Sequence, residues 1–271
     1  MMNQKGDFYM KEQLLNDSVA RRLRAGRPVS AAWAQLGSNV SAEIFAEAGF
    51  DALIIDMEHG PWDMQNTLAA MQACKGTGCA PFVRVPWNDM VWCKRALDLG
   101  AAGVHVPYVS TREEAESAVR FCKYPTAGGV RGIAGSQRAV RYGLRKAEYY
   151  AGADRDIIVM VAIESPEGVA NIAEIAAVEG VDGIFIGPSD LSTTMGHLAD
   201  PSQPDVQEAI AKIEREAKAQ GKFLGTIAPD FEGAKKLYDR GYSLVYFMSD
   251  TTSLAALAHS AAEAFKNSYP E

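Results

Sequence analysis

The sequence contains no long hydrophobic run. No segment reaches the roughly 18 uninterrupted apolar residues of a membrane-spanning helix. The stretch from Met1 to Gly26 carries charges throughout and lacks an apolar core of signal-peptide length. These two absences argue against a helical membrane protein, and they predict a chain that is not exported.

The sequence also lacks an excess of basic residues. It has 27 Lys and Arg against 34 Asp and Glu, a formal net charge of −7. Binding to a phosphate backbone needs clustered positive charge, so no nucleic-acid partner is expected. One local basic cluster occurs, and a solvated loop and helix face is the favoured explanation for it. Its members are Arg131, Arg138, Arg141, Arg145 and Lys146.

Cysteine is scarce as well. The four residues Cys74, Cys79, Cys93 and Cys122 form no C-x-x-C pair, and no His stands near them at zinc-site spacing. A structural zinc site and a disulfide scaffold are therefore unsupported. We expect reduced thiols and a cytoplasmic location.

What the sequence does contain is a regular alternation of short apolar runs with amphipathic stretches. Strands that are apolar throughout and covered by helices indicate a buried parallel sheet. Eight such units within 271 residues predict an α/β fold, a single-domain (β/α)8 TIM barrel spanning 1–271. The alternative is an open doubly wound sheet, but no G-x-G-x-x-G follows the first strand. The expected strands are Val29–Leu36, Ala52–Glu58, Pro81–Pro86, Gly103–Val109, Ile157–Glu164, Gly183–Gly187, Lys222–Ala228 and Leu244–Ser249.

Helical periodicity fills the intervals between these strands. Residues 1–28 are expected to form an N-terminal helical extension, and 251–271 a C-terminal helix. Two segments break the rhythm and are expected as loops, Tyr124–Tyr150 and Ser192–Pro204. The expected helices are Ser41–Ala48, Met64–Cys74, Trp92–Leu99, Glu113–Cys122, Val169–Val178, Asp205–Ala219, Glu232–Arg240 and Leu254–Phe265.

Ionisable residues end four of the eight expected strands. In a barrel of this kind, catalytic groups gather at the C-terminal ends of strands. The second strand ends in Asp56-Met57-Glu58-His59, the third carries Arg84, the fifth ends in Glu164, and the sixth runs into Gly187-Pro188-Ser189-Asp190. Together they form a candidate active site.

Glu164 and Asp190 are candidate metal ligands. Two carboxylates without a thiol or a pair of histidines nearby suit a hard, octahedral ion that keeps positions open for substrate, such as Mg²⁺ or Mn²⁺. The alternative is that Glu164 caps the helix opened by Ser165-Pro166-Glu167 and that Asp190 caps a turn before Leu191.

His59 and Arg84 are candidate catalytic groups. An imidazole beside carboxylates suits proton transfer near neutral pH. A guanidinium in an apolar strand needs an anionic partner, either in a structural ion pair or in a substrate. Of the other histidines, His105 is expected in the core, His259 on an exposed helix face and His197 in a loop.

These residues resemble six blocks of the HpcH/HpaI family of class II pyruvate aldolases, which includes the 4-hydroxy-2-oxoheptanedioate and 2-keto-3-deoxyglucarate aldolases. The resemblance runs from about Val29 to Thr251, and the order of the blocks makes coincidence improbable. The blocks are Asp56-x-Glu58-His59, Val83-Arg84-Val85-Pro86, Leu97-Asp98-x-Gly100, Gly129-x-Arg131-Gly132, Ile163-Glu164 and Phe185-Ile186-Gly187-Pro188-x-Asp190-Leu191-Ser192.

The resemblance implies a metal-dependent carbon–carbon lyase acting on a 2-oxo acid and an aldehyde through a pyruvate enolate. It implies Mg²⁺, Mn²⁺ or Co²⁺ at Glu164 and Asp190, and an enolate-stabilising Arg84. It implies that His59 is the acid/base and that Asp98 of an adjacent subunit raises its basicity. Asp56 belongs to the same block, and Gly187, Pro188, Ser189 and Asp190 would bind the pyruvate carboxylate. The family also suggests a homo-oligomer, often a trimer of dimers, with the last helix exchanged between barrels.

One departure concerns position 162. The family commonly has Gln two residues before the metal-binding Glu, whereas this chain has Ala162, on the same strand face as Glu164. Oxaloacetate decarboxylation or macrophomate-synthase-like chemistry is therefore an alternative, and Arg131, Arg138 or Arg141 would then meet an acidic partner. An acyl-CoA lyase and a non-catalytic barrel that binds a 2-oxo acid are further alternatives. The intact Asp56–His59 block favours the aldolase.

Overall fold

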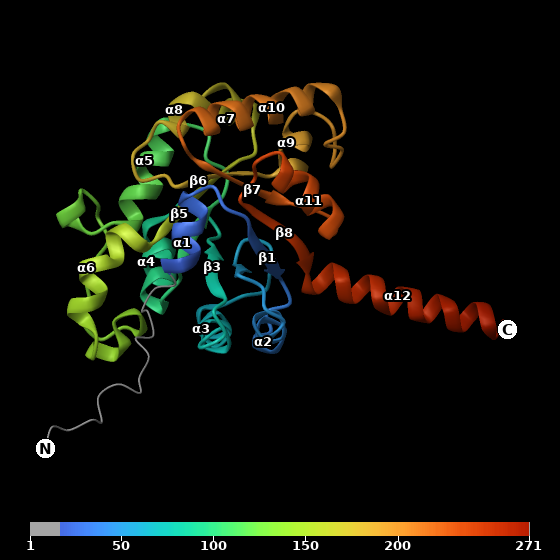
Figure 1. The fold of residues 1–271 in the computed structure, drawn as a ribbon, viewed down its shortest axis with the longest axis horizontal. Helices are drawn as coiled ribbons and strands as arrows, with labels where there is room; N and C mark the ends of the chain where they lie inside the picture. The colour runs from blue at the N-terminus through green and yellow to red at the C-terminus, as the bar shows by residue number, and fades with distance from the viewer. Residues whose placement is uncertain (1–16, 271) are drawn as a thin grey trace, which may run out of the picture.

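Eight parallel strands close into one barrel. A computed structural model describes residues 17–270, and its strands neighbour one another in sequence order, with β8 pairing back to β1. The predicted (β/α)8 fold is confirmed (Figure 1). The strands are β1 Val29–Ala34, β2 Ala52–Asp56, β3 Ala80–Arg84, β4 Gly103–Val106, β5 Ile158–Ile163, β6 Gly183–Ile186, β7 Phe223–Ile227 and β8 Leu244–Ser249.

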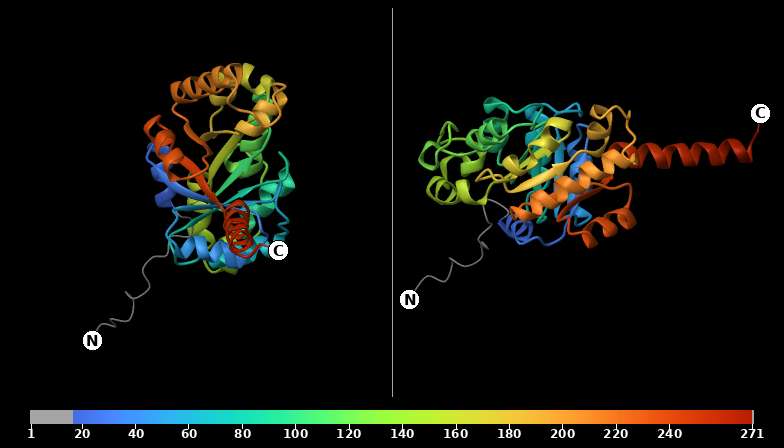
Figure 2. Two further views of the ribbon diagram at one scale, coloured as in Figure 1. Left: turned by 90° about the vertical axis from the view of Figure 1, so that its right-hand side faces the viewer. Right: turned by 90° about the horizontal axis from the view of Figure 1, so that it is seen from above.

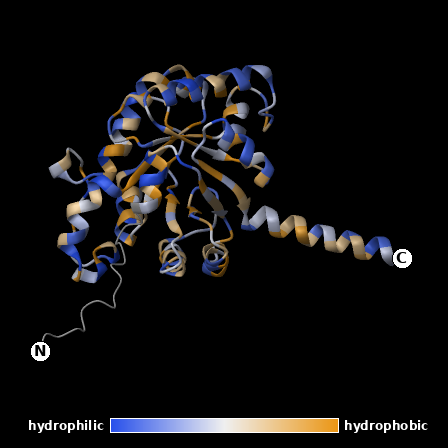
Figure 3. Cartoon of the chain, in the orientation of Figure 1, coloured by the Kyte–Doolittle hydropathy of each residue, from blue (hydrophilic) through white to orange (hydrophobic). Residues whose placement is uncertain are grey.

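Strand alternation divides the buried residues into two clusters. Inward side chains such as Ile54, Phe82 and Phe185 fill the barrel, and their neighbours, such as Ile55 and Val83, pack against the helices. Ala162 lies in the inner cluster, on the inward face predicted for it. In Figure 3 the strands form the hydrophobic centre of the molecule.

Most helices surround the barrel close to their expected positions, whereas α12 extends away from it (Figure 1). They are α1 Asp17–Arg24, α2 Asn39–Glu47, α3 Met64–Ala73, α4 Met90–Leu99, α5 Arg112–Cys122, α6 Lys146–Asp156, α7 Pro166–Ala170, α8 Ile172–Ala176, α9 Pro188–Thr194, α10 Pro204–Ala219, α11 Phe231–Asp239 and α12 Asp250–Ser268. No helix among these described residues has the length and apolarity needed to cross a membrane.

Three sequence-based expectations were wrong in detail. The helix expected at Val169–Val178 is two short helices, α7 and α8, which meet at Asn171. The loop expected at Ser192–Pro204 begins inside α9. The loop expected at Tyr124–Tyr150 contains two 3-10 turns, η1 Pro125–Ala127 and η2 Arg138–Gly143, and the start of α6. Pro188 and Pro204 stand at the first positions of α9 and α10, where proline favours the start of a helix.

The two ends of the barrel differ. Val19, Ala20 and Leu23 of α1 join the inner cluster, so this helix closes the N-terminal end of the barrel. Arg24 fixes α1 there through an ion pair of 2.8 Å with Asp182. Helix α1 falls within the extension predicted at 1–28, whereas residues 1–16 lie outside the described part of the chain. The C-terminal end remains open to solvent.

Candidate active site

The inward-facing side chains of the strands lead to the predicted site at the C-terminal end of the barrel. On β2 and β3 the inward residues after Ile54 and Phe82 are Asp56 and Arg84, which are register partners. On β5 the inward residue after Ala162 is Glu164. The period of two therefore brings charged groups from separate strands to one end of the barrel.

Arg84 is a buried guanidinium held by two carboxylates and an aromatic ring. Its Nε and Nη2 donate to Oδ1 and Oδ2 of Asp56 at 2.8 and 2.7 Å, and Nη1 lies 3.0 Å from Oε2 of Glu58. Its Cζ stacks 4.7 Å from the centre of the Trp33 ring. Two-point pairing and stacking fix a planar guanidinium far better than a single charge contact would.

Asp56 is the anchor of this arrangement. Burial alone would raise its pKa, but the hydrogen bonds and charge of Arg84 outweigh burial and hold the pKa of Asp56 well below its usual range. Trp33 Nε1 donates to it as well, at 3.0 Å. Asp56 therefore stays ionised, and it lies behind Arg84, away from the open pocket.

Glu164 is a buried carboxylate with far fewer hydrogen-bond partners than Asp56. Only 3% of the residue is exposed, and Oε2 accepts one bond of 3.0 Å from the backbone N–H of Tyr108. Burial, followed by the charges of Asp190 and Glu58, raises the pKa of Glu164 to about 7. A site with this much negative charge is prepared to receive a cation.

The turn after β6 is shaped around Glu164. A Cβ added to Gly187 would overlap Oε1 of Glu164 and lie 2.7 Å from its Cγ. A glycine here lets the carboxylate lie against the backbone that leads to Asp190.

His59 lies at the mouth of the site. Its side chain is 58% exposed, and Nε2 stands 3.9 Å from Oε1 of Glu58. Burial raises the pKa of Glu58, while the charges of Arg84 and His59 oppose that rise. The imidazole can thus reach a bound ligand and still lie beside a carboxylate.

One pocket of about 350 Å³ gathers most of the predicted residues. Arg84, Glu164 and His59 line it, together with Gly187, Pro188, Ser189 and Asp190. The other lining residues are Trp33, Gln35, Phe185, Ile227, Ala228, Pro229, Tyr246, Phe247, Met248, Ser249, Thr252 and Ser253.

Asp98 is not brought to this pocket within the single chain. It lies near the end of α4, where Nη2 of the buried Arg131 donates to it at 3.0 Å. Its role beside His59 was assigned to an adjacent subunit, and that role stays a prediction. Arg131 also donates to the hydroxyl of Tyr149, and Arg138 donates to the backbone carbonyls of Leu99 and Met71. Neither arginine lines the pocket.

The capping alternative for Glu164 and Asp190 is wrong. Helix α7 is capped by Ser165, whose hydroxyl accepts from the N–H of Gly168, and not by Glu164. Asp190 lies inside the first turn of α9, whose N-cap is Gly187 and which has no side-chain cap. Neither carboxylate is used by the local helix, so both remain available in the pocket.

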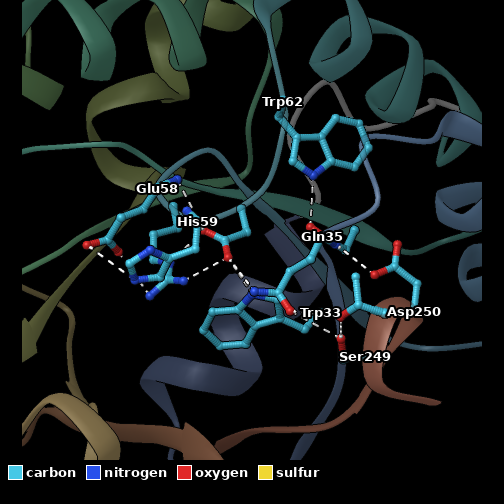
Figure 4. Close-up of polar contacts among 11 residues, drawn as sticks. Trp33, Gln35, Glu58, His59, Trp62, Ser249 and Asp250 are labelled. Atoms are coloured by element: carbon cyan, nitrogen blue, oxygen red, sulfur yellow. Dashed lines mark hydrogen bonds and ion pairs between the residues drawn. The ribbon is translucent and has the colours of Figure 1, made fainter. Parts of the chain in front are cut away.

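Sequence reasoning missed the end of β1. Trp33 and Gln35 both donate to Asp56, and Figure 4 shows the contact between the Gln35 amide and Ser249 as a dashed line. A polar Gln after an apolar strand was a usable signal, of the same kind that marked the other strand ends. His105, by contrast, is buried as expected, 4.4 Å from the ring of Phe185, and burial holds its pKa well below the usual value.

The arrangement has counterparts among known proteins. The model of the HpcH/HpaI aldolase/citrate lyase family matches residues 30–256. The chain belongs to this family. As a member of the HpcH/HpaI family it is an enzyme of the lyase class.

Individual relatives span nearly the whole chain. The 5-keto-4-deoxy-D-glucarate aldolase of Escherichia coli O139:H28 (strain E24377A / ETEC) is 43% identical over 234 residues, 86% of this HpcH/HpaI member and 91% of the relative. A family protein of Burkholderia cenocepacia J2315 has a similar structure, with a TM-score of 0.87 at 36% identity, covering 92% and 99% of the two chains. Macrophomate synthase is also similar, with a TM-score of 0.81 at 25% identity and coverage of 96% and 91%.

Proposed function

We propose that this lyase is a metal-dependent aldolase that cleaves or forms 4-hydroxy-2-oxo acids through a pyruvate enolate. The observation that carries the proposal is the joint exposure of Arg84, His59 and the two carboxylates Glu164 and Asp190 to one pocket. The 43% identical relative, named for 5-keto-4-deoxy-D-glucarate, supports a deoxy keto sugar acid as the substrate.

The donor set fits a hard divalent cation. Glu164 and Asp190 offer oxygen ligands, and the one Lys or Arg among the lining residues of the described chain, Arg84, is already paired. Within residues 17–270 no group of three His, Cys, Asp or Glu side chains could hold a metal ion, so two carboxylates would leave the other positions for water and substrate. Bound there, Mg²⁺, Mn²⁺ or Co²⁺ would act as a Lewis acid on the substrate carbonyl.

Arg84 would stabilise the negative charge of the enolate. Asp56, Glu58 and Trp33 hold its guanidinium before the substrate arrives, so little reorganisation is needed as charge develops. The substrate carboxylate would lie against the Gly187-Pro188 bend. There the N–H groups of Ser189 and Asp190 precede the first helical bond, which Leu191 donates to Gly187.

His59 would move the proton of the reaction. In cleavage the imidazole would take the proton of the C4 hydroxyl, and in synthesis it would return that proton to the forming alcohol. Its exposed position leaves room for Asp98 of a neighbouring subunit. We therefore include a homo-oligomer, with three dimers in a hexamer, in the proposal.

Decarboxylation is the second candidate function. Ala162 leaves no polar side chain at the position where the family commonly has Gln, and macrophomate synthase is similar over 96% of this chain. The same Arg84 could stabilise the enolate left when oxaloacetate loses carbon dioxide.

The experiment is proton exchange of pyruvate in deuterated water, followed by NMR after the protein has been stripped with a chelator. We expect exchange that needs Mg²⁺, Mn²⁺ or Co²⁺, disappears in Glu164→Ala and weakens in Arg84→Lys. Glu43→Ala, at an exposed position of α2, is the matched control and should exchange like the wild type. No exchange in protein shown to bind metal would overturn the pyruvate proposal. If oxaloacetate were the one substrate from which the protein released pyruvate, the decarboxylase would be favoured.

A further inference from the structure

Gln35 joins two parts of the molecule that lie at opposite ends of the sequence. Its Nε2 donates to Oδ2 of Asp56 at 2.9 Å. Its Oε1 accepts from the hydroxyls of Thr251 and Ser249, at 3.1 and 3.3 Å (Figure 4). One amide thus bridges the carboxylate under Arg84 and the junction of β8 with α12.

Chemistry fixes the direction of this bridge. Asp56 is ionised and can only accept hydrogen bonds. Ser249 and Thr251 bond each other at 2.8 Å, which uses one of their two hydroxyl protons and leaves the other to be donated to Gln35. A side chain placed between them must therefore donate on one side and accept on the other. An uncharged amide meets both needs in one orientation.

The backbone at Gln35 is held by the same junction. Asp250, the first residue of α12, is buried, and its Oδ1 accepts from the N–H of Gln35 at 2.8 Å. Its Oδ2 accepts from the N–H of Leu36 at 3.2 Å and from the hydroxyl of Ser41 at 2.8 Å. The position of Gln35 is therefore set by the base of α12.

On the other side, Asp56 controls two groups of the pocket. Its Oδ2 receives Gln35, Trp33 and Nη2 of Arg84, and its Oδ1 receives Nε of Arg84. The same Oδ1 accepts from the backbone N–H of His59 at 3.2 Å. A small rotation of this carboxylate would move both the guanidinium and the imidazole.

We propose that Gln35 is a positioning residue, which sets Asp56, and through it Arg84 and His59, from the β8–α12 junction. The inference rests on the proposed function for what Arg84 does to substrate. Errors of about 1 Å in the placement of a reacting group can cost 10²-fold in rate, so the bridge should be visible in kinetics.

Gln35→Glu provides the test, through the pH dependence of its defect. When the introduced carboxyl group is protonated, it can donate to Asp56 and accept from the hydroxyls as the amide does. When it is ionised, it cannot donate, and it faces the carboxylates of Asp56 and Asp250. We expect pyruvate exchange on the order of 10-fold below wild type at pH 8. The ratio of variant to wild type should rise toward one as the pH falls to 6.

Gln72→Glu, the same change at an exposed position of α3, is the matched control, and its ratio should not change with pH. A Gln35→Glu defect that is the same at every pH would overturn the positioning role. Because each ratio compares variant and wild type at the same pH, the titration of the native groups affects both proteins and cancels from the ratio.

Thr251→Val separates positioning from direct contact with substrate. Thr251 does not line the pocket, so a substrate bound there has no need of its hydroxyl. We expect a several-fold lower kcat for exchange with an unchanged KM for pyruvate. An unchanged kcat would mean that Gln35 acts by touching substrate, and the bridge would be rejected.

A binding measurement keeps this test apart from the proposed function. Oxalate, a dianion, is titrated by calorimetry into wild type and Gln35→Glu with Mn²⁺ present, at pH 6 and 8. If the variant binds oxalate more weakly than the wild type at pH 8 but not at pH 6, the bridge is supported. This holds even if the wild type exchanges no protons of pyruvate, in which case only the aldolase proposal would fail. An equal affinity ratio at both pH values would reject the bridge.

Discussion

At the scale of single residues, the site contains two buried ionisable side chains whose surroundings balance their charges to very different extents. Arg84 meets two carboxylates and an aromatic face, so its charge is balanced before any ligand binds. Glu164 has one backbone hydrogen bond and two like charges nearby. The first arrangement is a fixed clamp, and the second leaves a carboxylate that gains from a cation.

Glu164→Gln should stabilise the metal-free protein at high pH. The pKa of Glu164 is raised in the folded state, so its contribution to stability is present below about pH 4.5 and is lost as pH rises through about 7. The free energy of unfolding of the variant, relative to wild type, should therefore rise by roughly 3 kcal/mol over that range. Urea unfolding with a chelator, at pH 5 and 8 and one protomer concentration, measures it.

Adding Mn²⁺ at pH 8 should reverse that advantage, because only the ionised wild-type carboxylate can bind the ion well. A stability difference between the two proteins that changes with neither pH nor Mn²⁺ would contradict this prediction. It would mean that the pKa of Glu164 is not raised and that Glu164 does not bind the metal.

Asp56→Asn should be costly in both stability and rate. It leaves the buried Arg84 with Glu58 as its one charged partner, and breaking a buried pair from one side costs roughly 3 to 5 kcal/mol. Asp239→Asn, at an exposed position of α11, should change the free energy of unfolding by less than about 0.5 kcal/mol. Denaturation curves and pyruvate exchange of both variants provide the check, and equal stabilities would contradict the anchoring role.

At the scale of elements, the β6–α9 turn packs closely against Glu164. Here the backbone of Gly187 lies against the side chain of Glu164, and Pro188 starts the helix that carries Asp190. The turn therefore fixes both proposed metal ligands relative to each other.

Gly187→Ala should displace Glu164 without unfolding the barrel, since the added methyl overlaps the carboxylate. We expect metal-dependent exchange to fall on the order of 10²-fold, the size of effect that a misplaced group produces. Gly132→Ala is the matched control, because its added Cβ would meet only Lys94, at 3.6 Å. Pyruvate exchange rates and circular dichroism spectra of both variants test whether exchange is lost while the fold is retained. Wild-type exchange in Gly187→Ala would show that the turn tolerates the methyl group.

At the scale of the whole molecule, α12 is the one helix within residues 17–270 that leaves the barrel (Figure 1). It extends away from the other elements in Figure 1 and in the right-hand view of Figure 2. Leu254, Leu257 and Phe265 lie along one face of it and are 57%, 70% and 64% exposed. A helix with an exposed apolar face of this length is typical of one that packs on another copy of the chain.

A chain that stops after Ser253 should therefore form a smaller assembly than the full chain. It keeps Asp250 and the contacts at the base of α12, so the barrel should stay folded. Sedimentation velocity measures the assembly, and far-UV circular dichroism measures the fold. An unchanged number of subunits would reject helix exchange.

The barrel could be predicted from the sequence because its signals are local. Apolar strands of period two, helical stretches between them and charged residues at Asp56, Arg84 and Glu164 are all readable within a few positions. The same alternation placed Ala162 and Glu164 on one face. Helix boundaries such as the break at Asn171 were missed, since they depend on caps and packing that periodicity does not record.

Only the tertiary structure decided how these residues act on one another. Strand register sets the two-point contact between Asp56 and Arg84, and burial beside Asp190 and Glu58 raises the pKa of Glu164. Closure of the barrel brings Gln35 to Ser249, 214 positions away. Residue types and their spacing in this sequence determined which groups stand at the strand ends. The partners of those groups depend on distances across the barrel, which no local pattern encodes.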